Sequence, residues 1–443
     1  MPPPTARRPN VIWIFGDQHR GQATGYAGDA NLLTPNLDRL AAEGVTCTAA
    51  VSGFPLCCPA RGSLLTGLYP HRCVSAHQQP LPGGQRTIGH ELTDAGYHTA
   101  YIGKWHLGGW KEAKGRAAFF VTDPAQRGGF HEWLGYENNN SQYDCWVHGD
   151  GAPSPRRLPG YETDALTDEL IGYLHRRKTA GPDQPFFAVL SVQPPHNPYV
   201  APEEWMRRHT PGGVTLRPNV PAVPRLVERA RRELAGYYAM IENLDWNLGR
   251  VRATLAELGL TDDTLILFFS DHGDMHGSHG QFLKTSPWEE AIRVPFIVGG
   301  GVPHYGVNRG ISSAPINLPD IAPTTLGLCG VPVPAWMQGR DFSGLRISGR
   351  ALPADADSAF LQCDPTGHED SIDRSWRGVV TAEGWKYVVL AGQPWLLFNL
   401  NEDPYEQANH ALNPAYASQR RRLQTRLAGW MERTGDTFPL PAL

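Results

Sequence analysis

The feature that most constrains the fold is a series of short, almost wholly apolar runs, separated by segments that carry helix signals. These runs lack the polar alternation of half-exposed strands and are shorter than typical helices, so they indicate strands buried on both faces. The predicted strands are Asn10–Phe15, Tyr97–Ile102, Pro185–Val192, Thr264–Phe269 and Val294–Val298. Such strands, alternating with helices, predict an α/β fold whose mostly parallel central sheet is sandwiched by helices.

Helix signals occupy much of the chain between these strands. Thr34 and Pro35 suit the N-cap and first position of a helix that Gly44 would end. Further helices are predicted over Arg225–Leu258, Pro287–Arg293 and Pro319–Leu328. The segment Gly109–Pro159 is polar and aromatic with little periodicity, so we expect long loops there.

The pattern of apolar runs and turn residues changes after about residue 355. Short runs that each begin with tryptophan are separated by turn residues, which predicts an antiparallel sheet. These runs are Trp376–Val380, Trp385–Leu390 and Trp395–Asn399, and the basic segment Ser418–Arg433 predicts a helix after them. We therefore expect two domains: a large α/β domain over residues 8–355, and a small sheet-plus-helix domain over residues 356–443 that closes a cleft.

Composition excludes several classes of partner. A formal net charge of −4 argues against a broad basic surface for nucleic acid. Val11–Phe15 is shorter than the ~7–15 apolar residues of a secretory signal, and no run approaches the ~18 of a membrane span. The seven cysteines, an odd number without regular spacing, fit a reducing compartment. We expect a cytoplasmic protein with no membrane partner; export and homo-oligomer formation stay open.

Polar side chains follow the predicted strands closely. In parallel sheets, ligands bind outside the carboxyl ends of the strands, so residues at these positions converge on one site. The side chains in such positions are Asp17, His106, His196, Asp271 and His272. The sequence therefore predicts one composite site at this edge of the sheet.

The most informative local pattern runs from Cys57 to Gly67. Pro59 can begin a helix and Gly67 can end it, which places Cys57 just before a helix N-terminus. Backbone amide donors and the helix dipole favour an anion there. Arg61, one turn further on, can bind an oxyacid in bidentate fashion.

The whole pattern C-x-P-x-R-x-x-x-L-T-G over residues 57–67 resembles the signature of the sulfatase family within the alkaline-phosphatase superfamily. A second family block is similar to Gly96–His106. Further similar blocks follow in the family's order: Asn10–Gln18, Pro195–Tyr199, Ser270–Asp274, Glu289–Pro295, Asp320–Thr324 and Leu397–Gln407. The resemblance covers nearly the whole chain and implies an alkaline-phosphatase-like fold.

The resemblance also implies roles for the residues near Cys57. Cys57 would be converted to formylglycine by a formylglycine-generating enzyme, with Cys58 in the variable place of the signature. The positive side chains that would hold the sulfate oxygens are Arg61, Lys104 and Lys284. A histidine titrates in the right range to protonate a leaving alcohol, and the candidates are His106 and His196, with His196 or Lys284 nearest that oxygen by family analogy.

A divalent cation is implied at the same place. Carboxylate oxygens suit a hard cation, and Asp17 and Asp271 supply them. The full candidate ligand set is Asp17, Gln18, the modified Cys57, Asp271 and His272. The resemblance favours Ca²⁺, but an imidazole ligand also suits Mn²⁺ or another transition metal.

The resemblance, together with these residues, implies an enzyme that hydrolyses sulfate monoesters. A small carbohydrate sulfate is the first expectation for the substrate and an aryl sulfate the second, because the aromatic and amide-rich segment His131–His148 suits a sugar ring. The pair Gln18 and His272 also resembles the branch of phosphonate monoester hydrolases and phosphodiesterases. The sequence leaves open as well a non-catalytic protein that binds sulfated glycans, and an enzyme that uses an unmodified thiol.

Overall fold

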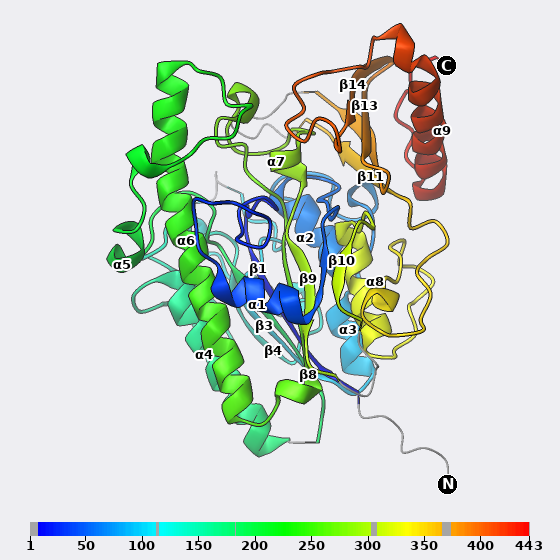
Figure 1. Ribbon diagram of the computed structural model, residues 1–443. Helices are drawn as coiled ribbons and strands as arrows, with labels where there is room; N and C mark the ends of the chain where they lie inside the picture. Colours follow the sequence, from blue (N-terminus) through cyan, green and yellow to red (C-terminus); the bar gives the residue numbers. More distant parts are fainter. Residues whose placement is uncertain (1–7, 112–114, 182, 303–307, 366–373, 443) are drawn as a thin grey trace.

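The computed structural model describes residues 8–111, 115–181, 183–302, 308–365 and 374–442. Within these residues the strands form one ten-stranded sheet and one four-stranded sheet (Figure 1). Residues 1–7, on which the expectation about a secretory signal partly rests, lie outside this part. Among the described helices, none has the length and apolar character needed to cross a bilayer.

The large sheet has a parallel run at its centre, with antiparallel pairs on either side of that run. Its strands are β1 (Asn10–Gly16), β2 (Val45–Cys47), β3 (His98–Lys104), β4 (Glu132–Tyr136), β5 (Trp146–Gly149), β6 (Ala152–Arg157), β7 (Phe186–Val192), β8 (Thr264–Ser270), β9 (Phe296–Gly300) and β10 (Gly310–Ser312). They lie in the order β10-β2-β9-β8-β1-β7-β3-β4-β5-β6. The run from β8 to β4 is parallel, whereas β9, β5 and β6 pair antiparallel. The predicted mostly parallel α/β fold is confirmed.

Helices cover both faces of this sheet because alternate residues of each central strand point to opposite sides. The helices are α1 (Pro35–Glu43), α2 (Cys57–Thr66), α3 (Ile88–Asp94), α4 (Glu162–Ala180), α5 (Glu203–Met206), α6 (Pro224–Glu257), α7 (Glu289–Ile292), α8 (Leu318–Leu328) and α9 (Ala417–Thr434). Trp13 lies in the core shared with α2, α3 and α8, and Ile12 and Ile14 in the core shared with α1, α4 and α6. In Figure 1 these two groups of helices flank the sheet.

One expectation about these elements is wrong. The segment Gly109–Pro159 contains β4, β5 and β6 rather than only loops. Short strands at a sheet edge can be largely polar, as in the sequence APSPRR of β6, and such strands carry no periodic apolar signal. The predicted bounds of α1 are confirmed, with Thr34 at the N-cap, Pro35 as the first residue and Gly44 after the end. The Thr34 hydroxyl makes no cap bond; it accepts from the Gly25 amide and donates to Asp38.

The small sheet contains β11 (Ser358–Cys363), β12 (Trp376–Thr381), β13 (Trp385–Leu390) and β14 (Gln393–Asn399), all antiparallel. One face packs with α9, which Figure 1 shows at the outer side of this sheet. The other face packs on Val51, Phe54 and Leu56, the residues that lead directly into Cys57. The C-terminal part of the chain thus supports the segment that presents Cys57.

A buried cation ties the small sheet to α7. Lys386 on β13 is fully buried, and its Nζ lies 3.2 Å from Glu289 Oε1 and donates to the carbonyl of Pro287 at 2.7 Å. It also forms an ion pair with the buried Glu406. Removing one partner of a buried ion pair leaves an uncompensated charge, which is strongly destabilising.

We expect Lys386→Met to lower the free energy of unfolding by about 3–5 kcal/mol, because the buried Glu406 loses this cation and Glu289 keeps only Arg293. Urea unfolding followed by circular dichroism measures this change. Lys178→Met is the matched control, since Lys178 is exposed on α4 and its loss should change stability by less than about 0.5 kcal/mol. Equal stability of the two variants would contradict the assignment of Lys386 as the buried link.

Candidate active site

The candidate residues lie where four neighbouring strands of the large sheet end. Asp271 follows β8, Asp17 follows β1, His196 lies in the loop after β7, and Lys104 is the last residue of β3. These strands are adjacent in the order β8-β1-β7-β3 and run in the same direction. The topology therefore brings together side chains that lie far apart in the sequence.

Helix α2 presents Cys57 to this strand-end region. Cys57 is the first residue of the helix, with Leu56 as N-cap, and does not precede the helix as expected. Every residue of α2 is buried, and the helix ends at Gly67 in the left-handed conformation, with φ of 67°. A side chain at the first turn of a buried helix lies beside unpaired backbone amides, which favours an anionic group.

The Cys57 sulfur is surrounded by charged and polar groups. Its Sγ lies 3.1 Å from Lys284 Nζ, 3.3 Å from His272 Nε2 and 3.6 Å from Asp17 Oδ1. Only 2% of the residue is exposed. If position 57 carries a modified side chain, this sulfur marks where an oxygen bonded to the same carbon would lie.

Cys57 and Cys58 differ sharply in electrostatic environment. Burial opposes ionisation of the Cys57 thiol, but positive charges led by Lys284 and Lys104 outweigh it and lower its pKa below the ordinary value. Burial raises the pKa of the Cys58 thiol far above its ordinary value, and the charge of Cys57 raises it further. The more reactive thiol is therefore at position 57, where the motif spacing also placed it.

Arg61 holds the two central carboxylates in place. Its Nε donates to Asp271 Oδ2 and its NH2 to Asp17 Oδ2, both at 3.1 Å, while NH1 donates to the carbonyl of Lys104 at 2.7 Å. Lys104 Nζ lies 2.7 Å from Asp17 Oδ2. All four side chains are at most 1% exposed, so these charges compensate one another away from water. Burial raises the pKa of Asp17, but Lys104 and the other nearby cations hold it well below its usual range.

The donor atoms of four residues could share one cation. Carboxylate oxygens of Asp17 and Asp271, Cys57 Sγ and a ring nitrogen of His272 all lie within 4.8 Å of one another. His272 Nδ1 lies 3.0 Å from the carbonyl of Gly273, which directs Nε2 and its lone pair towards the carboxylates. This donor set fits a divalent cation with mixed oxygen and nitrogen ligands.

Gln18 is held by residues that the sequence analysis did not single out. Its Nε2 donates to Asp274 Oδ2 at 2.5 Å, and the Tyr199 hydroxyl donates to the same oxygen at 2.6 Å. Gln18 Oε1 accepts from Lys284 Nζ at 2.9 Å, so one lone pair of this oxygen is already engaged. Asp274 and Tyr199 both lie in sequence blocks that pointed to the site, but their contact with Gln18 requires the fold.

Both candidate proton-transferring histidines are buried. Burial lowers the pKa of His196 well below its ordinary value, and Lys284 lowers it further. Burial also lowers the pKa of His106 well below its ordinary value, and Lys104 lowers it further. His196 Nδ1 lies 2.7 Å from the carbonyl of Asn197, which fixes the ring. Both imidazoles are thus neutral at neutral pH when no anion is bound nearby.

The aromatic segment His131–His148 only partly faces solvent. Trp133 lies in β4, is 1% exposed and packs edge-on against Trp105, so its role is structural. Tyr143, by contrast, is 42% exposed. Of the residues expected to contact a sugar, Tyr143 is therefore available and Trp133 is not.

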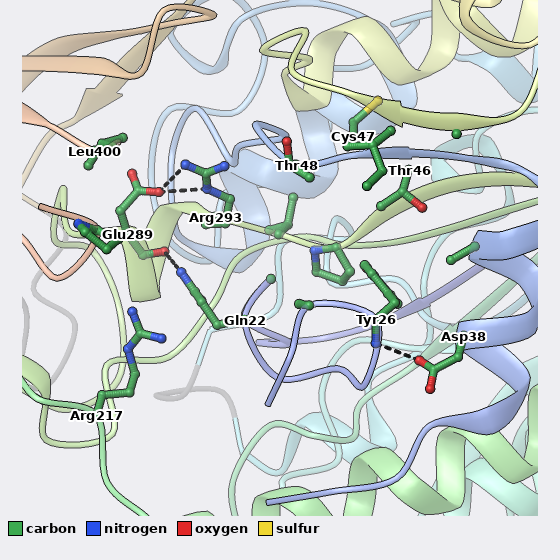
Figure 2. A pocket seen from close by; sticks show the side chains of 18 of the residues that line it. Gln22, Tyr26, Asp38, Thr46, Cys47, Thr48, Arg217, Glu289, Arg293 and Leu400 are labelled. Atoms are coloured by element: carbon green, nitrogen blue, oxygen red, sulfur yellow. Dashed lines mark hydrogen bonds and ion pairs between the residues drawn. The ribbon is translucent and has the colours of Figure 1, made fainter. Parts of the chain in front are cut away.

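A cavity of about 670 Å³ lies elsewhere, between α1, β10 and the segment around Tyr405. Figure 2 shows its labelled lining side chains, among them Gln22, Arg217 and Arg293. Arg293 is paired with Glu289, and Arg217 Nε lies 2.7 Å from Glu290 Oε1. The described lining includes none of the candidate catalytic or metal-binding residues, so this cavity is separate from the strand-end site.

Comparison with known proteins agrees with this geometry. The family model described as Sulfatase matches residues 9–331, and the one described as N-sulphoglucosamine sulphohydrolase, C-terminal, matches residues 277–433. The chain is 35% identical to an ulvan-active sulfatase of Formosa agariphila, over 97% of this chain and 82% of that protein. It is 30% identical to an endo-4-O-sulfatase of Bacteroides thetaiotaomicron, over 92% of this chain and 89% of that protein.

A solved structure agrees as well. The protein yidJ of Bacteroides fragilis superposes with a TM-score of 0.87 at 28% identity, covering 98% of this chain and 97% of that one. Sulfatases in general use a metal ion and a formylglycine, and the chain has donor groups suited to hold a metal. The protein is a sulfuric ester hydrolase that belongs to the sulfatase family of the alkaline-phosphatase superfamily.

Proposed function

We propose that this protein hydrolyses sulfate monoesters of carbohydrates, using a formylglycine made from Cys57 and one divalent cation. The observation that carries the proposal is the position of Cys57 Sγ, which lies between Lys284 Nζ and His272 Nε2 and within the donor group of Asp17 and Asp271. In domain terms, residues 8–355 would form the catalytic part and residues 356–443 the supporting part.

A formylglycine fits position 57. Lys284 Nζ, His272 Nε2 and Asp17 Oδ1 lie at 3.1–3.6 Å around the sulfur, so a hydrated aldehyde would find hydrogen-bond partners for its oxygens. Such a hydrate supplies an oxygen nucleophile and, through its second hydroxyl, a way to release the sulfate. The maturing enzyme that makes this group is a partner the proposal requires.

A single divalent cation fits the neighbouring donors, with Ca²⁺ as the first choice and Mn²⁺ as the second. Two carboxylates favour a hard cation, while His272 leaves room for a transition metal. Asp17, Asp271, His272, position 57 and the remaining lone pair of Gln18 Oε1 would hold it. Such an ion supplies positive charge that stabilises an oxyanion nucleophile.

The remaining residues then have distinct tasks. Arg61 orients Asp17 and Asp271 and places positive charge beside both carboxylates. Lys104 and Lys284 bring positive charge next to the oxygens of a bound sulfate. With Cys57 unmodified, burial opposes the charge of Lys284, but the charges of Cys57, Asp17 and Asp271 outweigh it and raise its pKa.

Proton transfer to the leaving alcohol falls to His196 or Lys284, with His106 nearby. His196 is neutral when no anion is bound, and an anionic sulfate ester in the site would favour its protonation. A protonated His196 can then donate to the leaving oxygen.

We expect His196→Ala to slow hydrolysis of an alkyl or sugar sulfate by about 10²–10⁴-fold, because the alkoxide leaving group needs a proton. The same variant should lose far less activity on a nitrophenyl sulfate, whose phenolate leaves without one. The ratio of kcat/KM values on these two substrates, in the variant and the unaltered protein, measures the effect. Equal losses on both substrates would show that His196 does not protonate the leaving group.

A carbohydrate substrate is supported by two observations. The family model that matches residues 277–433 is described as N-sulphoglucosamine sulphohydrolase, C-terminal, and so names a sugar substrate. Tyr143 is exposed in the segment His131–His148, where an aromatic face can pack against a sugar ring. An aryl sulfate is the second candidate.

The direct test is turnover of paired substrates by protein whose conversion at position 57 has been verified. We expect hydrolysis of a sugar sulfate and of an aryl sulfate, with a lower kcat/KM on the matching aryl phosphonate. A preference for the phosphonate would support the second function, which the Gln18 and His272 pair favours. Tight binding of sulfate esters without turnover would instead support a binding protein.

Removal of the cation provides a separate prediction. Dialysis against a chelator should reduce sulfate-ester hydrolysis by at least about 10²-fold, because the two carboxylates lose the charge that activates the nucleophile. Activity should return on adding one equivalent of Ca²⁺ or Mn²⁺. Full activity in the chelated protein, verified metal-free by elemental analysis, would contradict the proposal.

The proposal includes a reducing location, such as the cytoplasm. All seven cysteines are free and buried in the described structure, and none of their thiols pairs with another. Free thiols in such number are typical of reducing compartments.

A further inference from the structure

We propose a second metal site, formed by Cys58, His77 and His106, that binds Zn²⁺ and is distinct from the group around Asp17 and Asp271. Each of these three residues offers one ligand atom, and the three atoms all lie within 4.8 Å of one another. Together they are called here the Cys58 cluster. The proposal concerns a soft-metal site and does not depend on which ester the enzyme hydrolyses.

The three ligands reach one point from separate segments. Cys58 lies in the first turn of α2, His77 in the loop between residues 73 and 87, and His106 two residues beyond the end of β3. The imidazole rings of His77 and His106 are nearly perpendicular, at 86°, with centroids 5.7 Å apart. Such an arrangement lets a nitrogen of each ring point at one ion beside the thiol.

An independent observation points to a missing ligand. His106 is 3% exposed, yet among the described residues neither of its ring nitrogens has a hydrogen-bond partner. Buried polar atoms without partners are rare because they cost free energy that a ligand can recover. The backbone of His106 is in the left-handed region, with φ of 57°, a conformation that is uncommon outside glycine and recurs at functional sites.

The donor types select the ion. One thiol and two imidazoles form a soft set, typical of Zn²⁺, and contain no oxygen ligand for Ca²⁺ or Mg²⁺. Burial lowers the pKa of His77 to about 4 and that of His106 well below its ordinary value, so both rings are in the neutral form that binds metals. On binding, Zn²⁺ replaces the Cys58 thiol proton, which passes to solvent. Three protein ligands leave the fourth tetrahedral position for a water molecule.

Occupancy of this site has a consequence for the enzyme. An ion bound to His106 would fix its ring and occupy the nitrogen lone pair that a bound substrate or a proton would otherwise use. It would also place positive charge beside Lys104. Zn²⁺ bound here is therefore inhibitory, which makes the Cys58 cluster a regulatory site.

The binding test uses Co²⁺ as a spectroscopic probe in a Cys57→Ala background, in which position 57 carries no sulfur. With Ca²⁺ present in excess to fill the site at Asp17 and Asp271, we expect Co²⁺ to give a thiolate-to-metal absorption band that saturates at one equivalent. Cys57→Ala/Cys58→Ala should lose the band. Cys57→Ala/Cys47→Ala, which removes another buried cysteine, should keep it. A missing band in Cys57→Ala, or a band that survives loss of Cys58, would overturn the proposal.

A second variant tests the same site without replacing the buried Cys58, so that loss of the band cannot be attributed to misfolding. His77 is only partly buried, so Cys57→Ala/His77→Ala should keep its fold, as thermal unfolding would verify. Loss of an outer-shell partner lowers the affinity of a metal site by about 10–100-fold. Because His77 would be a direct ligand, its loss should lower the affinity for Co²⁺ by more than this. Unchanged affinity would exclude His77 as a ligand and overturn the three-residue site.

The inhibitory role is tested in the matured enzyme with Cys57 intact. Zn²⁺ should inhibit hydrolysis of a sulfate ester by the unaltered enzyme, and Cys58→Ala should require at least tenfold more Zn²⁺ for the same inhibition. Equal sensitivity of the two proteins would overturn regulation through the Cys58 cluster. The Co²⁺ experiment stands without any turnover, so its result is separable from failure of the proposed function.

Discussion

Cys57→Ala is expected to lower kcat on a sulfate ester by roughly 10⁴–10⁶-fold, the range seen when a central catalytic residue is removed from a hydrolase. The reason is that position 57 supplies the only nucleophile in the proposed reaction. Lys284, His272 and Asp17 surround this side chain and would remain in place around an alanine. The measurement is initial rate at saturating substrate, with substrate binding assayed separately.

The matched control for this variant is Cys58→Ala. Cys58 is adjacent in sequence and fully buried, but burial raises its pKa and its thiol is outside the proposed chemistry. It should retain activity within about tenfold, a loss consistent with small packing changes. If Cys57→Ala were active and Cys58→Ala inactive, the assignment of the nucleophile would be reversed.

Arg61→Met should both destabilise the protein and reduce its activity. Arg61 is 1% exposed and bridges Asp17 and Asp271, which are fully buried. Removing the guanidinium leaves Asp271 without this partner and leaves Asp17 paired with Lys104 alone, so we expect the free energy of unfolding to fall by about 3–5 kcal/mol in metal-free protein. The measurement is denaturant unfolding with and without a divalent cation.

The cation dependence of this variant is its most specific feature. Added Ca²⁺ should recover more stability in Arg61→Met than in the unaltered protein, because the ion would supply positive charge opposite the same carboxylates. Arg39→Met is the matched control: Arg39 is 71% exposed in its pair with Glu43, so its loss should change stability by no more than about 1 kcal/mol. Arg61→Met with the stability of this control would show that the two carboxylates do not depend on Arg61.

The central strands were predictable because burial on both faces demands an uninterrupted apolar run. The predicted runs Asn10–Phe15 and Thr264–Phe269 each differ by one residue from β1 and β8. Residues that follow such strands meet at one edge of a parallel sheet, so Asp17 and Asp271 could be paired from the sequence. The basic C-terminal helix was also found, within one residue of the ends of α9.

The parts that were missed depend on tertiary context. Helix α4 buries Glu162, Thr163 and Thr167 beside its apolar residues, so no clean apolar stripe marks it in the sequence. Strand β6 lies at the sheet edge with a largely exposed sequence. The contact between Gln18 and Asp274 joins residues 256 positions apart, and no local pattern reveals such a contact.

The central claim is that turnover depends on an aldehyde at position 57, and mass spectrometry tests it directly. Trypsin releases residues 40–61, which contain Cys47, Cys57 and Cys58, and fragmentation of this peptide locates any conversion. Across preparations with different degrees of maturation, sulfate-ester turnover should rise in proportion to the converted fraction at position 57 and vanish at zero conversion. Full turnover in protein whose position 57 is entirely cysteine would contradict the account.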